Sequence, residues 1–189
     1  MLRNALAATA LGVCAIVPAW AAADSFDLDP THTYPSFEIN HLGFSTMRGS
    51  FTATSGTLTY DPDTHTGSVK ATIDAASVNT GFGKRDEHLR SKEFFNVEKF
   101  PTLAFSADNF KLEADKPATV TGSLTLLGVT KPVSLSVQPT QCAKRMGKDF
   151  VCGAVVTGVI KRSDWGMTAY VPYVGDEVKL QIEVEAVKK

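Results

Sequence analysis

Three cationic side chains, His41, Arg48 and Arg162, lie near the ends of alternating apolar segments. From Phe37 to His41, residues of odd number share one face of a strand, so the imidazole points the same way as an aromatic ring. Arg48 and Arg162 lie near strand ends and can approach the same opening. Such a group suits a carboxylate, phosphate or quinone head group. A histidine satisfied by a backbone carbonyl explains His41 equally well.

A second charged group fills the segment 83–93, whose composition favours a helix. It contains Lys84, Arg85, Asp86, His88 and Arg90. These side chains could receive an anionic head group or shield an opening, and they also suit a solvated helix face. The apolar residues of the segment do not alternate. We therefore predict a short helix and a turn that cap one end of a β-structure.

Catalytic sequence motifs are absent. The chain has no G-x-S-x-G, H-E-x-x-H, glycine-rich phosphate loop or C-x-x-C. Asp86 and His88 could orient one another, but no nucleophile is marked beside them, and the four histidines lack the spacing of zinc ligands. We expect no catalytic residue, no metal and no required cofactor. The rival hypothesis is an enzyme or redox partner acting on a quinone or lipid, with His41 and His88 handling protons.

The cysteines indicate an oxidising compartment. Cys142 and Cys152 flank a polar turn with Gly147 in its middle, so two strands joined there would bring them opposite one another. This spacing predicts a disulfide across a hairpin, worth about 3 kcal/mol in the chain-entropy model. A metal site is the weaker alternative, since no further ligand stands nearby.

The first 23 residues have the pattern of a secretory signal peptide. Arg3 precedes an uncharged run from Ala5 to Val17, and small residues follow up to Ala23. The run is shorter than the roughly 20 apolar residues that span a bilayer. We expect cleavage, no stable transmembrane anchor and an exported protein of one domain, residues 24–189.

Charge and size narrow the function further. Without residues 1–23, the chain has 18 basic and 20 acidic side chains and a net charge of −2. No basic field therefore favours nucleic acid. The sequence does not decide whether two copies pair, so a homodimer stays open.

Alternation with a period of two residues dominates the remaining chain. In the clearest run, Val178 to Ala186, apolar residues alternate with lysine, glutamine and glutamate. The pattern predicts an all-β fold, an up-and-down barrel or a tall sandwich, with about eight long antiparallel strands. We place them near 25–29, 34–42, 47–60, 67–77, 101–113, 118–127, 132–142 and 149–161, with 174–187 as a ninth or barrel-closing strand.

Pattern alone does not decide whether such a barrel is hollow. Several inward positions are small, among them Gly122, Ala154 and Gly158, which would leave volume inside. Large aromatic residues are numerous enough to wall a pocket or to fill a core. A packed, ligand-free structural or stress protein is thus a third hypothesis.

The chain resembles the YceI-like family of bacterial periplasmic proteins. The resemblance rests on motifs in this order: Asp29–Thr33, Phe37–Ser45, Arg48–Phe51, Lys84–Ser91, Phe94–Pro101, Thr121–Val133 and Arg162–Met167. Leu127 stands where the family usually has histidine, and the cysteine pair is not a general family feature.

The resemblance implies a lipocalin-like extended antiparallel barrel that binds polyisoprenoids or similar amphiphiles, including isoprenoid quinones. It implies no catalytic residues, because the family has none in common. We therefore expect a carrier whose only partner is a small lipid, an isoprenoid or a fatty chain, bound in an apolar tunnel. The predicted tunnel residues are Phe37, Ile39, Phe44, Phe51, Phe94, Phe95, Phe105 and Val155. The predicted head-group residues are His41, Arg48 and Arg162.

Overall fold

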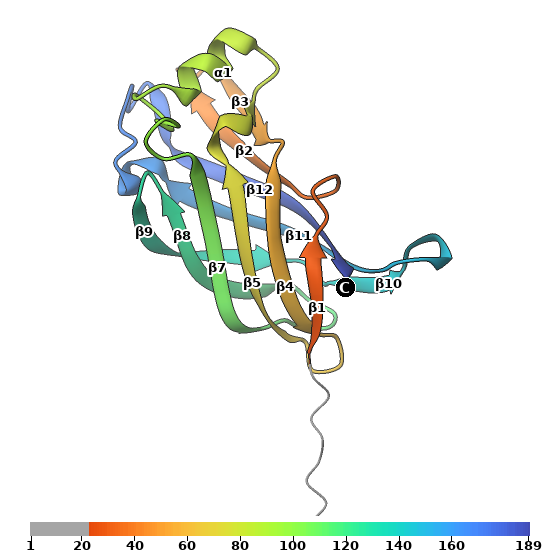
Figure 1. The fold of residues 1–189 in the computed structure, drawn as a ribbon. Coiled ribbons are helices and arrows are strands. Elements are labelled where there is room, and N and C mark those ends of the chain that lie inside the picture. Colours follow the sequence, from red (N-terminus) through yellow and green to blue (C-terminus); the bar gives the residue numbers. More distant parts are fainter. Residues whose placement is uncertain (1–22) are drawn as a thin grey trace, which may run out of the picture.

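The computed structural model describes residues 23–189, so the predicted signal peptide lies outside the described residues except for Ala23. Eight antiparallel strands form a closed barrel, which confirms the predicted fold class (Figure 1). In order around the ring these strands are β11 (Phe150–Lys161), β9 (Val129–Val137), β8 (Ala118–Leu126), β7 (Thr102–Lys111), β5 (Thr66–Asp74), β4 (Thr54–Asp61), β1 (Asp24–Leu28) and β12 (Val174–Lys188).

Strand β12 closes the ring. It pairs with β11 over eleven residue pairs, from Val151 opposite Val187 to Lys161 opposite Glu177. On its other side, β12 pairs first with β2 (Tyr34–His41) and then with β1. The alternation predicted for 174–187 thus belongs to the barrel-closing strand.

Two predicted strands are each divided in the structure. The expected strand 47–60 is two strands, β3 (Ser45–Phe51) and β4, because the chain turns at Thr52, whose N–H donates to the Ser77 carbonyl. The expected strand 132–142 is also two, β9 and β10 (Gln141–Lys144). Pro139 lies between them and has no N–H to donate to a strand ladder.

Helix α1 (Gly83–Arg90) confirms the predicted short helix, and Figure 1 places it at one end of the barrel. The turn that joins the end of β2 to the start of β3 lies at the same end of the barrel. Strand β3 also pairs with β6 (Val78–Asn79). Among the described residues there are also three short 3-10 turns, at Ala75–Ser77, Arg145–Gly147 and Arg162–Trp165. No helix within residues 23–189 is both long and apolar enough to cross a membrane.

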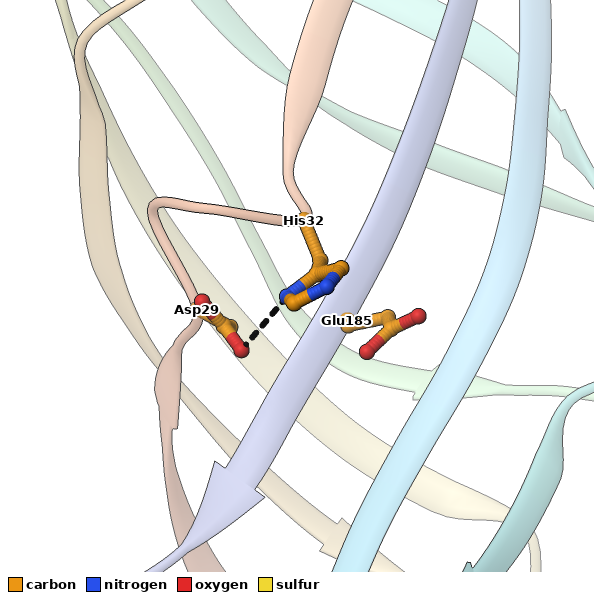
Figure 2. A group of neighbouring side chains, drawn as sticks. All are labelled: Asp29, His32 and Glu185. Atoms are coloured by element: carbon orange, nitrogen blue, oxygen red, sulfur yellow. Dashed lines mark hydrogen bonds and ion pairs between the residues drawn. The ribbon is translucent and has the colours of Figure 1, made fainter. Parts of the chain in front are cut away.

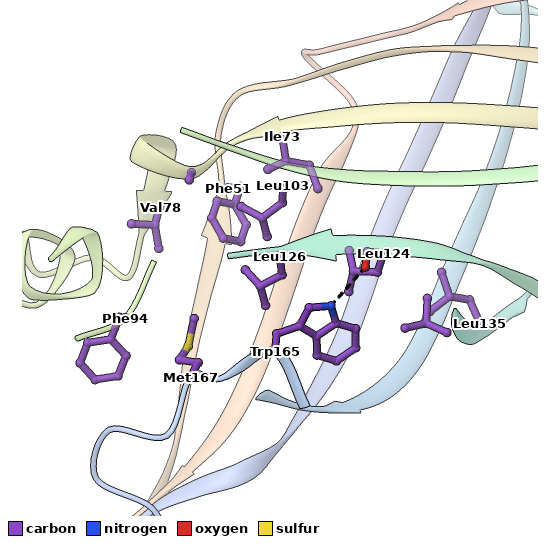
Figure 3. Packing of buried hydrophobic residues seen from close by; sticks show 12 residues of the cluster. Phe51, Ile73, Val78, Phe94, Leu103, Leu124, Leu126, Leu135, Trp165 and Met167 are labelled. Carbon is purple, nitrogen blue, oxygen red and sulfur yellow. Dashed lines mark hydrogen bonds between the residues drawn. The ribbon is translucent and has the colours of Figure 1, made fainter. Parts of the chain in front are cut away.

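The buried side chains form two clusters along the barrel. The cluster toward α1 includes Phe51, Phe94, Trp165 and Met167 (Figure 3). The Trp165 indole N–H donates to the Leu124 carbonyl oxygen at 3.1 Å, which fastens the turn after β11 to strand β8. The second cluster includes Phe26, Tyr60, Leu112 and Ala186 and lies toward the other end. Phe105 on β7 is partly buried and packs against both clusters.

Inward glycines do not create the interior volume, contrary to our expectation. A Cβ on Gly122 would lie 2.5 Å from the Phe105 ring, and one on Gly158 would lie 2.6 Å from a Leu135 methyl. Both glycines therefore give room to a large neighbouring side chain. The prediction that these positions leave volume was wrong at Gly122 and Gly158.

Candidate functional site: an apolar cavity inside the barrel

The barrel encloses a cavity of about 500 Å³, within the usual range of ligand sites. Its walls come from strands all around the ring, and most wall side chains are aliphatic or aromatic. Examples from different strands are Leu58, Val69, Phe105, Val120, Leu135, Val156 and Leu180. Many of these side chains point inward yet remain partly exposed, because the cavity itself is accessible to solvent. The question that the sequence left open is therefore answered in favour of a hollow barrel.

The cavity opens at the α1 end. Of its lining residues only Arg48, His88 and Tyr170 are exposed, and their neighbours place them at that end. At the opposite end the lining includes Tyr60 and Leu112, which are buried in the second cluster. A molecule would therefore enter beside α1, and its apolar part would lie toward the closed end.

An aromatic and acid–base group lies at this mouth. The His88 Nε2 and a Glu93 carboxylate oxygen are 2.5 Å apart, and the Tyr170 hydroxyl donates to the same oxygen at 3.4 Å. The hydrogen bond from His88 lowers the pKa of the Glu93 carboxyl. Phe94 stacks on the Tyr170 ring with centroids 6.0 Å apart. These contacts join the α1 region to the loop before β12.

The charged residues of α1 are largely engaged in holding the helix. Asp86 is buried, and its carboxylate accepts hydrogen bonds from the N–H and the hydroxyl of Thr80. Arg85 donates from Nε to the Thr80 hydroxyl at 2.7 Å, and Arg90 donates to the Ala76 carbonyl. The cluster noted in the sequence therefore anchors α1 to the chain before it, while Arg85 and His88 also line the cavity.

Six of the eight predicted tunnel residues line the cavity. They are Phe37, Ile39, Phe51, Phe94, Phe95 and Phe105. Phe44 does not, because it lies in the turn between β2 and β3, where its side chain is 89% exposed. Val155 does not either, because the inward positions of β11 are Ala154 and Val156, and Val155 between them faces outward and is 40% exposed. Both residues are removed from the predicted tunnel.

The three predicted head-group residues all border the cavity but are not equivalent. Within residues 23–189 no group hydrogen-bonds the His41 imidazole, so it is available to a ligand. Arg48 donates from Nε to Glu38 at 2.6 Å across the β2–β3 pair. Arg162 is 3% exposed and donates to four backbone carbonyls, and its burial lowers the pKa of the guanidinium. The proposed cationic cluster is therefore reduced to His41, with Arg48 at the rim.

A model of the YceI-like domain matches residues 26–186. The chain belongs to the YceI-like family. It is 39% identical to Protein YceI of Salmonella arizonae over 89% of this chain and 88% of that protein. The solved structure of a Campylobacter jejuni YceI protein is similar with a TM-score of 0.69 and 32% identity, over 80% of this chain and 90% of the other.

A more distant structural neighbour is a polyisoprenoid-binding domain from Saccharophagus degradans, implicated in plant cell wall breakdown. It has a TM-score of 0.65 and 18% identity, and the match covers 89% of this chain and all of that domain. At this identity the likeness concerns the fold. The YceI-like barrel is thus shared among sequences that differ at most positions.

Sequence reasoning missed one polar group of this YceI-like chain. Asp29, His32 and Glu185 come together beside β12, with the Asp29 carboxylate 2.9 Å from the His32 Nδ1 (Figure 2). Their ligand atoms lie within 4.8 Å of one another, a spacing that could hold a metal ion. The Arg145 guanidinium, however, donates to Asp29 at 3.0 Å and to Glu185 at 3.2 Å. The group therefore serves as an ion-pair network in this structure.

The network ties the hairpin of β10 and β11 to the barrel. Cys142 and Cys152 face each other in that hairpin with Cα atoms 4.1 Å apart and are joined by a disulfide, as predicted. Arg145 lies in the turn between them. The motif from Asp29 to Thr33 could have suggested a polar site, but the sequence contains no signal that brings Arg145 to it.

Proposed function

We propose that this chain is a periplasmic carrier that holds a long-chain amphiphile, such as a polyisoprenoid, an isoprenoid quinone or a fatty-chain lipid, inside its barrel. The observation that carries the proposal is the apolar cavity of about 500 Å³, whose exposed lining residues Arg48, His88 and Tyr170 lie at the α1 end. Each methylene group moved from water into such a cavity contributes about 0.8 kcal/mol. A hydrocarbon chain is therefore held with few polar contacts.

Family membership agrees with this ligand class. The Saccharophagus degradans neighbour is a polyisoprenoid-binding domain with the same fold. In this chain the polar end of the amphiphile would lie at the mouth, where His41 and His88 border the cavity and can donate or accept a hydrogen bond. Arg162 has no part in this role, because its donors are directed to the backbone.

The proposal is one of binding without catalysis. Asp86 cannot orient His88 as a catalytic pair, because the buried Asp86 carboxylate bonds Thr80 and His88 contacts Glu93 instead. If His41→Ala abolished turnover of a quinone or lipid while ligand retention stayed intact, an enzyme would replace the carrier.

Organic extraction of the purified protein followed by mass spectrometry tests the carrier function directly. We expect a long-chain amphiphile in near-stoichiometric amount, and displacement of an apolar fluorescent probe when that amphiphile is added back. Absence of both signals would refute the carrier. N-terminal sequencing of protein from the periplasmic fraction tests export, with Asp24 or Ala22 as the expected first residue.

Two neighbouring substitutions locate the bound chain. Ala154→Trp places a large ring in the cavity, because Ala154 lines it. Val155→Trp puts the same ring on the outside of β11, where the side chain is already exposed. We expect Ala154→Trp to weaken probe binding at least tenfold and Val155→Trp to leave it unchanged. Equal effects of the two substitutions would place the ligand elsewhere.

A further inference from the structure

Large apolar side chains are exposed together around the cavity mouth. Leu42 and Phe44 occupy the turn between β2 and β3, Phe82 immediately precedes α1, and the loop before β12 exposes three more. These six residues form the mouth rim: Leu42, Phe44, Phe82, Tyr170, Val171 and Tyr173. Phe44 is 89% and Tyr173 70% exposed, so neither contributes to the core.

Contacts make the rim continuous with the cavity. The Leu42 N–H donates to the Tyr173 carbonyl oxygen at 2.8 Å, which joins the β2–β3 turn to the loop before β12. Tyr170, in the same loop, lines the cavity and stacks on Phe94. Figure 1 shows α1 and the neighbouring ends of β2 and β3 at this same end. The most exposed apolar side chains of the rim therefore border the opening through which a ligand passes.

The rest of the described chain does not repeat this arrangement. The other exposed large apolar residues of the described chain are Tyr34, Val129, Met146, Val155 and Val159. Met146 lies at the tip of the β10–β11 hairpin, Val155 and Val159 lie on the outer face of β11, and none of the five lines the cavity. Single exposed apolar side chains are ordinary on soluble proteins, whereas a group around an opening indicates an interaction surface.

Ligand chemistry and residue type identify the partner. An amphiphile that fits the cavity has little solubility in water and resides in a bilayer. Tyrosine and phenylalanine are favoured at the boundary between head groups and acyl chains. Two exposed lysines, Lys84 in the first turn of α1 and Lys92 just after the helix, lie at this end and suit phosphate head groups.

We infer that the mouth rim docks on a phospholipid bilayer, so that the hydrocarbon chain passes between membrane and cavity without crossing water. The inference rests on the proposed carrier function. Insertion of apolar side chains supplies the binding, since acids such as Glu87 offset part of the positive charge near α1. We therefore expect docking to persist in 0.5 M salt.

Vesicle flotation tests the surface. The purified protein is floated with vesicles of phosphatidylethanolamine and phosphatidylglycerol. Each large apolar side chain that moves from water into the membrane interface strengthens vesicle binding about tenfold. We expect the double variant Phe44→Ser and Tyr173→Ser to bind vesicles at least tenfold more weakly than the original protein. The matched double variant Met146→Ser and Val159→Ser removes exposed apolar side chains elsewhere and should bind as the original does.

An apolar fluorescent probe added without vesicles separates the two proposals. The rim variant should bind the probe normally, because Phe44 and Tyr173 do not line the cavity. Vesicle binding that is absent in the original protein, or unchanged in the rim variant, would overturn the docking surface and leave the carrier intact. The docking surface would also be overturned if the original protein were a dimer and the rim variant a monomer, because a second copy of the chain would then cover the rim. If the original protein bound vesicles normally but did not bind the probe, the carrier function would be refuted and the docking surface would stand.

Discussion

Arg162 donates a 2.8 Å hydrogen bond from its Nε to the carbonyl oxygen of Gly175 at the start of β12. The same guanidinium donates to the carbonyls of Met167, Ala169 and Val174. One buried side chain thereby holds the loop between β11 and β12 in place. That loop contains Tyr170, so the shape of the cavity mouth depends on an arginine that need not touch the ligand.

Replacing Arg162 with lysine should lower stability. An ammonium group has no planar fork and cannot reach the four carbonyls from one position, so buried acceptors lose partners. We expect the free energy of unfolding to fall by about 2–3 kcal/mol, measured by urea denaturation. The control is Arg48→Lys, whose exposed pair with Glu38 should change stability by less than about 0.5 kcal/mol. Equal effects would contradict the structural role of Arg162.

Asp29→Asn should destabilise the protein at neutral pH and much less in acid. Hydrogen bonds from the Thr31 hydroxyl and from Arg145 lower the pKa of the Asp29 carboxyl well below its usual range. A carboxyl with a lowered folded pKa stabilises the protein above its unfolded pKa of about 3.9, and this contribution is lost as the pH falls toward the folded value. We expect a loss of about 1–2 kcal/mol at pH 7 that shrinks steadily below pH 4.

Urea denaturation between pH 2 and pH 8 measures this difference. Asp27→Asn is the matched control, because Asp27 pairs with Lys189 on the surface and its side chain is 63% exposed. Its effect should stay below about 0.5 kcal/mol throughout. A loss at Asp29 that does not vary with pH would show that the carboxylate charge is unimportant there.

Removing the disulfide should cost stability without closing the cavity. The bond joins residues ten apart, so its loss frees a short loop, worth about 2–3 kcal/mol in the chain-entropy model. We expect the double variant Cys142→Ala and Cys152→Ala to unfold at lower urea and to bind an apolar probe nearly as before. The free energy of unfolding of the original protein under reducing conditions should match that of the variant within about 1 kcal/mol. A larger discrepancy would indicate that the alanines themselves alter packing.

Gly122→Ala should disturb both stability and binding. The added methyl would lie 2.5 Å from the Phe105 ring and from the Ser106 carbonyl oxygen, so strand β8 or that ring must move. Overpacking of this kind costs about 1–3 kcal/mol, and Phe105 lines the cavity. Gly83→Ala is the control, because nothing lies within 4 Å of the new methyl. Probe affinity and thermal unfolding measure the two effects, and a silent Gly122→Ala would contradict the close packing against Phe105.

Local patterns accounted for the strands and for much of the cavity wall. Phe37 and Ile39 lie two residues apart on one strand, so their common inward direction follows from the pleat. Phe44 and Val155 escaped the pattern for definite reasons. Phe44 falls in a turn, where alternation has no meaning. Val155 lies among apolar neighbours on both sides, so composition did not reveal which positions face inward.

The sequence by itself determined the all-β class, the short helix and the cysteine pair, because alternation, helix composition and hairpin spacing are properties of neighbouring residues, and the motifs shared with the YceI-like family pointed to a barrel rather than a sandwich. Only the tertiary structure decided that the barrel is hollow, that its mouth lies beside α1, and that Arg162 holds a loop. It alone brought Arg145 to Asp29, 116 residues away. Such outcomes depend on how side chains from distant strands meet across the ring, and a one-dimensional pattern does not encode that distance.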